Sequence, residues 1–344
     1  MIVSQRASGS LFGAALGDAM GAPTEFLQVD DILRRFPPDG PQEPLGNPAR
    51  VTDDTQMMLA VGEALRTVAT KGKFDPPALE TALRQTLVDW LNSPDNDRAP
   101  GVTCLRACRN LAQGRSWRDA TVASSKGCGA NMRVAPVGLL QGISEEQRSA
   151  IAQFQAAFTH GHPTALAASD LTAATIAYLC RGNEAKRLMA YLFDYAHSQQ
   201  TLYHSHWLGS LWRHPGVIDA ADFISRGWDE CFVALHHLQS AIKKADKQID
   251  PCSLTGAGWV AEEAFATGLL CFLLFLDDPL AALQRAAVTA GDSDSIACLT
   301  GAFIGAYYGI EVWPKGWIER IEYGARLAEL GDYLDTTQHT HAVR

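Results

Sequence analysis

Two short acidic motifs, one toward each end of the chain, contain residue types that bind divalent cations. Thr52, Asp53 and Asp54 directly precede an apolar-periodic run that predicts a helix. One of these carboxylates could simply cap the helix, because it would accept the free N–H groups of the first turn. Capping does not account for both acids, and neighbouring residues at a helix start point in different directions. Two carboxylates there can therefore converge on Mg²⁺ or Mn²⁺, which prefer oxygen ligands.

The second motif, Asp292, Asp294 and Ser295, lies at the start of another apolar helix, Ile296 to Tyr308. Each motif alone is more often a helix cap than a metal site. Two such motifs in one chain favour the metal site, because together they supply enough oxygen ligands for two ions about 3.5–4 Å apart. We therefore predict a dinuclear Mg²⁺ or Mn²⁺ centre where the two helix starts meet.

A glycine-rich segment, 124–133, precedes a predicted helix and contains Gly127 and Gly129. Such a turn suits a phosphate, because the free N–H groups and the dipole of the following helix attract anions. A tight turn between helices explains the same residues equally well. His160 and His162 lie two residues apart in a second turn, where they could hydrogen-bond a ligand or cap helices.

A third glycine turn, Gly256 to Gly258, places Trp259 before the apolar segment 264–276. An aromatic side chain there could stack on a base or a ribose, and packing in the core is the equally simple alternative. The segment 264–276 is too short to span a bilayer and predicts a buried helix. We therefore expect no membrane partner.

The composition is typical of a soluble globular protein, with 344 residues that are 47% hydrophobic and 19% charged. The formal net charge of −9 argues against broad binding to nucleic acids or to anionic membranes. The eight cysteines include no C-x-x-C pair, so neither a zinc knuckle nor a redox motif is expected. This pattern favours a cytoplasmic location.

Apolar periodicity predicts an almost entirely helical chain, and no useful length alternates in the manner of a strand. We expect one compact, orthogonal multi-helix all-α domain over residues 1–344, with the metal centre at helix N-termini. A proline-rich loop at 27–50, an irregular aromatic segment at 198–220 and a frayed tail at 331–344 are expected. The predicted helices cover residues 10–20, 54–70, 78–91, 102–112, 134–140, 146–158, 164–181, 184–197, 221–246, 260–276, 293–308 and 315–331.

Six stretches resemble the ADP-ribosylglycohydrolase family, which includes the dinitrogenase reductase-activating glycohydrolases, and they follow the family's order. They are GAALGDAMGAPTEF (13–26), VTDDTQM (51–57), KGCGANMRVAPVGL (126–139), the His-Gly-His-Pro turn, TGAGWVAEEA (255–264) and AGDSDSIACLTGAFIGA (290–306). The resemblance implies a compact all-α fold with two Mg²⁺ or Mn²⁺ ions. The family's metal-ligand positions fall on Thr52, Asp53, Asp54, Asp292, Asp294 and Ser295.

The resemblance also implies roles at the substrate. Glu25 falls on an acidic position near the metals, and Trp259 on an aromatic position near the adenosine end. The family's loop around the diphosphate and ribose corresponds to Gly127, Gly129, Asn131 and Met132. With the histidine and glycine turns, the expected substrate-binding residues are Gly127, Gly129, Asn131, Met132, His160, His162, Gly256, Gly258 and Trp259.

The activity implied by the resemblance is hydrolysis of the N-glycosidic bond between ADP-ribose and an arginine of a modified protein. Asp53, Asp54 or Glu25 would accept a proton from the attacking water or assist the leaving group. The main alternative is an O-linkage, in ADP-ribosyl-serine or O-acetyl-ADP-ribose. An alternative function is a binding protein that keeps the fold without catalysis. A site that had lost its activity would not need such mutually repelling acids, which argues against this alternative. A further rival is an immunity protein against an ADP-ribosylating toxin, with a cognate ADP-ribosyltransferase as partner.

Overall fold

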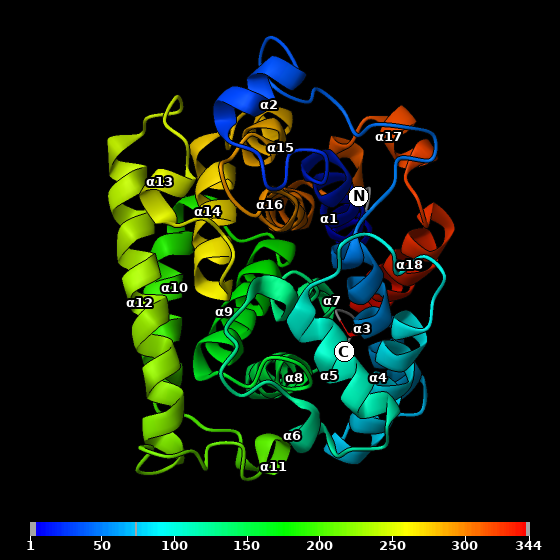
Figure 1. The fold of residues 1–344 in the computed structure, drawn as a ribbon, viewed down its shortest axis with the longest axis vertical. Coiled ribbons are helices and arrows are strands. Elements are labelled where there is room, and N and C mark those ends of the chain that lie inside the picture. The colour runs from blue at the N-terminus through cyan, green and yellow to red at the C-terminus, as the bar shows by residue number, and fades with distance from the viewer. Residues whose placement is uncertain (1–4, 73, 342–344) are drawn as a thin grey trace.

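The computed structural model describes residues 5–72 and 74–341, and the side chains among them up to residue 336. Helices form the regular structure of this part of the chain, and no strand occurs within it (Figure 1). The predicted all-α fold is therefore confirmed. The helices are α1 (Arg6–Gly21), α2 (Val29–Arg35), α3 (Asp53–Thr70), α4 (Pro76–Leu91), α5 (Val102–Ala112), α6 (Trp117–Ala120), η1 (Cys128–Ala130), α7 (Ala135–Leu139), α8 (Glu145–Ala157), α9 (Pro163–Cys180), η2 (Ala185–Arg187), α10 (Leu188–Gln199), α11 (Ser205–Leu208), α12 (Ala220–Lys244), α13 (Cys252–Thr255), α14 (Ala261–Leu274), α15 (Pro279–Ala287), α16 (Ser293–Tyr308), η3 (Ile310–Val312), α17 (Lys315–Arg320) and α18 (Gly324–His341).

Helices α1 and α16 pack side by side in the upper middle of Figure 1, and their contact surface consists of small residues. On α1 these residues recur at every fourth position, which places them on one helix face. A Cβ at any of them would overlap the backbone of α16. The close approach of the two backbones therefore requires glycine. The facing pairs are Gly9 with Gly305, Gly13 with Gly301, Gly17 with Ala297 and Gly21 with Ser293.

The order of these pairs makes α1 and α16 antiparallel, so the end of α1 lies beside the start of α16. The start of α16 carries the second acidic motif, and the residues after α1 include Glu25. The glycine stripe thus joins segments from opposite ends of the chain.

The N-terminus of α1 is held by the last helix, α18. The carboxylate of Asp335 accepts the backbone N–H of Ala7 at 2.8 Å, and both the N–H at 3.0 Å and the hydroxyl at 2.7 Å of Ser8. A carboxylate in this position satisfies N–H groups that have no partner within their own helix. The sequence predicts a frayed tail from residue 331, whereas α18 continues to His341. Residues 342–344 lie outside the described part of the chain.

Several further elements differ from the sequence prediction, and the helix predicted at 315–331 is divided into α17 and α18. The proline-rich segment 27–50 contains α2, and the irregular segment 198–220 contains the one-turn α11. Helix α15 is not predicted at all, although Asp278 caps it by accepting the N–H of Ala281 at 3.2 Å. Short helices like these carry too few periodic positions to be recognised by pattern alone.

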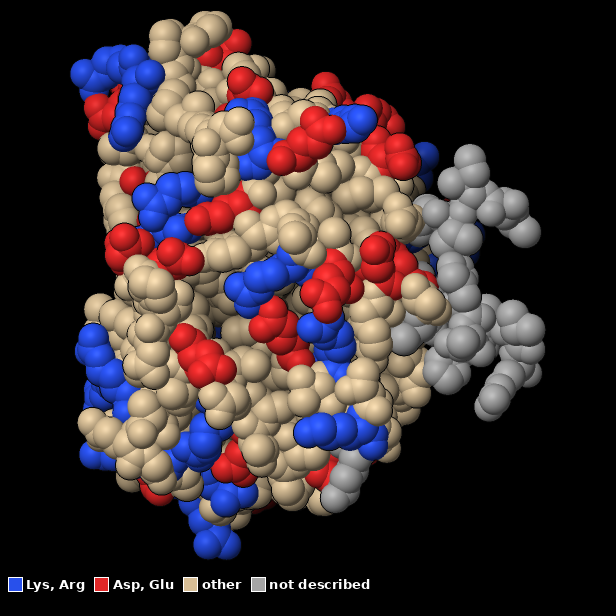
Figure 2. Space-filling view, turned by 90° about the vertical axis from the view of Figure 1, so that its right-hand side faces the viewer, with Lys and Arg blue, Asp and Glu red and all other residues tan. Residues whose placement is uncertain are grey.

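The surface carries charges of both signs. On the face drawn in Figure 2, acidic and basic side chains are scattered among one another. Within the described residues, no helix combines the length and apolar character that a membrane span requires.

Candidate metal centre and ligand cavity

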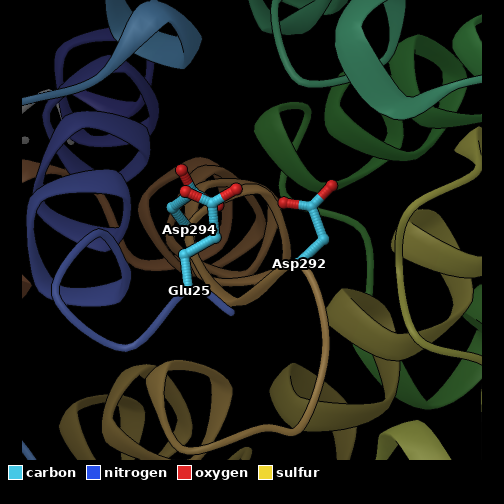
Figure 3. Close-up of side chains that lie close together, drawn as sticks. All are labelled: Glu25, Asp292 and Asp294. Carbon is cyan, nitrogen blue, oxygen red and sulfur yellow. The ribbon is translucent and has the colours of Figure 1, made fainter. Parts of the chain in front are cut away.

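Three carboxylates meet where α1 ends and α16 begins. Glu25 follows α1, Asp292 is the N-cap residue of α16, and Asp294 lies in its first turn. One oxygen from each lies within 4.8 Å of the others, and Figure 3 shows the three side chains gathered at this end of α16. This is the spacing at which carboxylates share a divalent cation.

The first motif reaches the same place from α3. Thr52 caps α3 by accepting the N–H of Asp54 at 3.3 Å, so the capping role falls to the hydroxyl. The adjacent carboxylates of Asp53 and Asp54 line one cavity together with Glu25, Asp292 and Asp294. These five acids are called the carboxylate cluster below. The side chains of the two motifs therefore meet at the N-termini of α3 and α16, as predicted.

Asp18, on α1, fixes the position of the first motif. Its buried carboxylate accepts the N–H of Thr52 at 3.0 Å, the N–H of Thr55 at 3.1 Å and the hydroxyl of Thr55 at 2.6 Å. Asp18 therefore ties the start of α3 to α1, three residues before α1 ends beside Asp294. This role of Asp18 was not predicted, although a single acid within a glycine- and alanine-rich helix is a visible signal in the sequence.

The cluster raises the pKa values of its own members. Burial, and then the charge of Asp294, raise the pKa of Glu25 to about 9 and that of Asp53 to about 7. The same two causes hold the pKa values of Asp54 and Asp292 well above the usual range. So many buried acids repel one another strongly unless cations or protons neutralise them.

The donor set fits a divalent cation. The Oδ2 atom of Asp54 is buried and has no hydrogen-bond partner, so a lone pair remains available for a ligand. The remaining oxygens come from carboxylates and from the hydroxyl of Ser295, which also lines the cavity. Magnesium and manganese prefer such all-oxygen sites.

The cavity above the cluster, called the ligand cavity below, has a volume of about 350 Å³. Gly127, Gly129, Met132, His160 and Trp259 line it, as do the acids described above. Sequence analysis placed these residues at the substrate, and the fold brings them together from three separate turns.

The other expected substrate residues lie elsewhere. The Asn131 amide donates to the carbonyl of Ala261 at 3.0 Å, and the ring of His162 caps α9 by accepting the N–H of Thr164 at 3.2 Å. Gly256 lines a different cavity, beside Lys126. Gly258, at φ 84°, allows close approach to Ile296 on α16.

A buried chain of hydrogen bonds orients His160. The Arg133 guanidinium, itself fully buried, donates to the hydroxyl of Thr159 at 2.9 Å, and this hydroxyl lies 2.8 Å from Nδ1 of His160. A hydroxyl that accepts from Arg133 still has its own proton to donate, and Nδ1 is an acceptor within reach. We therefore infer that Nδ1 accepts this proton and that Nε2 carries the ring proton. A Cβ at Gly127 or Gly129 would meet the ring, which explains both glycines.

Burial and Arg133 lower the pKa of His160 to about 3, so its ring is neutral at physiological pH. A neutral ring with a proton on Nε2 can donate a hydrogen bond to an anionic ligand without adding charge. Arg133 and Thr159 were not singled out from the sequence, because nothing local links them to a ligand.

Sequence analysis also missed part of the cavity wall. Phe26 stacks on Trp259 with ring centroids 5.4 Å apart and planes 18° apart. The segment from Ala99 to Cys104 forms the wall beside Asp53, and the N–H of Gly101 donates to Asp53 at 3.4 Å. The proximity of this segment to the acids depends on the packing of α5 and could not be read from its composition.

Residues 2–343 match the family described as ADP-ribosylglycohydrolase. The chain is 26% identical to the ADP-ribosylarginine hydrolase Tri1 of Serratia proteamaculans, covering 96% of this chain and 78% of that protein. It is 28% identical to the ADP-ribosylhydrolase ARH3 of Bos taurus, covering 92% and 88%. A solved structure described as an ADP-ribosylglycohydrolase-related protein complex aligns with a TM-score of 0.67 and 22% identity, covering 98% of this chain and 99% of that one.

Proposed function

The chain belongs to the ADP-ribosylglycohydrolase family, and from this premise we propose that it removes ADP-ribose from arginine side chains of modified proteins. The observation that carries the proposal is the ligand cavity, in which the carboxylate cluster and the His160 ring face one space. The carboxylates of this cavity suit cations, and an N–H of the neutral His160 ring suits an anion. A ribose chelated to metal ions, with a diphosphate attached, offers both kinds of partner.

The proposed ligands of two Mg²⁺ or Mn²⁺ ions are Thr52, Asp53, Asp54, Asp292, Asp294 and Ser295. When bound, such ions polarise substrate hydroxyls and make a nearby water more acidic. The family resemblance supports all six residues, and the unpartnered Oδ2 of Asp54 independently supports Asp54.

Hydrolysis forms a bond between the water oxygen and the anomeric carbon of the ribose, and breaks the bond from that carbon to the guanidine nitrogen. One proton must leave the water and one must reach the departing guanidine. Glu25, Asp53 and Asp54 are the proposed carriers. Glu25 is the least buried of the three, and nearby cations would lower its raised pKa into the range of a proton carrier.

The substrate is held by groups that do not react. We propose that Nε2 of His160 donates to a phosphate oxygen, and that Gly127 and Gly129 leave room for the diphosphate beside the ring. Met132 would contact the ribose and Trp259 the adenosine end. These contacts hold the anomeric carbon close to the acids, which contributes to the rate by positioning.

The closest competing substrate class is O-linked ADP-ribose, on serine or in O-acetyl-ADP-ribose. The similarity to an ADP-ribosylarginine hydrolase favours arginine as the modified residue. Because the similarity to ARH3 is equally extensive, the experiment below also includes an O-linked substrate. An immunity role, with a cognate ADP-ribosyltransferase as partner, would use the same chemistry to erase a toxin's modification. None of the eight cysteines, all of which the structure describes, forms a disulfide, in keeping with the proposed cytoplasmic location.

The test is release of ADP-ribose from arginine-modified and serine-modified proteins, with Mg²⁺, Mn²⁺ or EDTA. Release from the arginine substrate that EDTA abolishes is the expected result. Release from the serine substrate alone would replace the arginine proposal by the O-linked one. No release from either substrate, with metal bound, would contradict the hydrolase proposal.

A further inference from the structure

The mouth of the ligand cavity is unusually apolar. Eight large apolar side chains are exposed among the described residues, and three of them line this cavity. Phe26 is 67% exposed, Val102 80% and Trp259 43%. Single exposed apolar residues are ordinary, whereas a group around a polar cavity marks a contact surface. Trp259 is the residue proposed above for the adenosine end, so the two remaining side chains, Phe26 and Val102, are called the apolar rim below.

The backbone holds part of the rim in a costly conformation. Phe26 has φ of 64° and Ala99, in the wall next to Val102, has φ of 53°. Four non-glycine residues of the described chain have positive φ, and these two line the ligand cavity. Such conformations cost about 1–3 kcal/mol and persist at functional sites. The protein thus maintains Phe26 outside the core at some expense in stability.

Val102 is fixed relative to the acids. It is the first residue of α5, and the preceding Gly101 donates its N–H to Asp53 at 3.4 Å. Phe26 directly follows Glu25 in the sequence and stacks on Trp259. The rim is therefore attached to the carboxylate cluster at two points, and a molecule seated on it is positioned relative to the reacting groups.

We propose that the apolar rim docks the polypeptide that flanks the modified side chain of the substrate protein. This inference rests on the proposed function. A cavity of about 350 Å³ is at the small end of the range for one small-molecule ligand, so a polypeptide attached to ADP-ribose must lie at its mouth. The side chains of the rim are uncharged and would not bind a phosphate. They would instead pack against apolar side chains next to the modified residue of the substrate protein.

The test compares two substrates that contain the same scissile bond. One is an arginine-ADP-ribosylated protein, and the other is free ADP-ribosyl-arginine, which has no flanking polypeptide. Val102→Asn is the variant, because it replaces the more exposed side chain of the rim and leaves the stack of Phe26 on Trp259 intact. We expect it to lower kcat/KM for the modified protein by about fivefold or more, mainly through KM, since truncating a contact residue weakens binding. For free ADP-ribosyl-arginine we expect a change of less than about twofold.

Ile218→Asn is the matched control. Ile218 is 83% exposed and does not line the ligand cavity, so this substitution should leave both substrates unaffected. Equal losses on both substrates, or no loss on either, would overturn the docking proposal while the hydrolase proposal stands. A change from dimer to monomer in light scattering of the Val102 variant would assign the rim to self-association instead. If the unmodified enzyme hydrolyses neither substrate, the proposed function fails and the docking proposal fails with it.

Discussion

Asp294 acts on every other acid around it. Its charge raises the pKa values of Asp18, Glu25, Asp53, Asp54 and Asp292, in each case as the largest cause after burial. A carboxylate that repels so many buried neighbours stabilises the folded protein only when a bound cation offsets the repulsion. We therefore expect Asp294 to couple metal binding to the stability of the protein.

The substitution Asp294→Asn should have opposite effects with and without metal. In EDTA the variant should melt at a higher temperature than the unmodified protein, because a source of buried repulsion is gone. With Mg²⁺ or Mn²⁺ the unmodified protein should gain about 2.7 kcal/mol at a hundredfold excess of metal over Kd, and the variant should gain little. Thermal melts of the variant and of the unmodified protein, in EDTA and in Mg²⁺ or Mn²⁺, measure these differences. A variant that metal stabilises as strongly as the unmodified protein would exclude Asp294 as a ligand.

Asp18 has a different task, because it holds Thr52 and Thr55 in place. We expect Asp18→Asn to weaken metal binding about 10–100-fold, which is the usual effect of losing a group that orients metal ligands. High metal concentration should restore most of the activity. Titration of activity with Mn²⁺ checks this, and loss of activity that saturating metal does not restore would show that Asp18 does more than position α3.

At the level of elements, the packing of α1 against α16 sets the geometry of the site. The facing glycines let the two helix backbones touch, and this contact places Glu25 next to Asp292 and Asp294. The anchoring of α1 by Asp335 fixes the other end of the same helix. Small residues far from the cavity thus control the spacing of the carboxylates.

A methyl group in this contact should be costly. Gly13→Ala would press a Cβ against the carbonyl of Gly301, and we expect destabilisation of about 1–3 kcal/mol or more. Gly316→Ala, in α17, is the control, because a Cβ there meets nothing within 4 Å. Alanine is the better helix former, so this control should be neutral or slightly stabilising. Urea unfolding of both variants gives the comparison, and equal midpoints would contradict the close-packing account.

At the level of the whole molecule, a few buried acids make folding sensitive to pH. Burial and the charge of Asp294 raise the pKa values of Asp18 and Asp53 to about 7, and that of Glu25 to about 9. Between the ordinary carboxyl pKa near 4 and these values, the folded protein holds protons that the unfolded chain has released. Its stability must therefore fall as pH rises through this window.

In EDTA we expect the melting temperature to fall between pH 6 and pH 9. Metal affinity should change in the opposite direction, because the ligands must lose their protons before they bind. Melts over this range, with EDTA and with saturating Mg²⁺, test both statements. The Asp294→Asn variant should show a weaker pH dependence in EDTA. A melting temperature that rises with pH in EDTA would contradict the raised pKa values.

Much of this protein is determined by local sequence. The 3.6-residue period identified most helices, and the predicted ranges 102–112 and 293–308 coincide with α5 and α16. Helix-start chemistry identified the two acidic motifs, because carboxylates and hydroxyls before an apolar run are recognisable without a partner.

Only the tertiary structure decided which of these local signals act together. Asn131 and His162 belong to turns expected at the substrate, yet their side chains bond to Ala261 and Thr164. Phe26, Asp18 and Val102 join the site through contacts across the chain that no local pattern records. The continuation of α18 past residue 331 was likewise not predicted, because Asp335 is held there by hydrogen bonds to Ala7 and Ser8, which lie at the other end of the chain. Periodicity reports how a segment faces the core, whereas a site depends on which faces meet, and that is fixed by packing between segments distant in sequence.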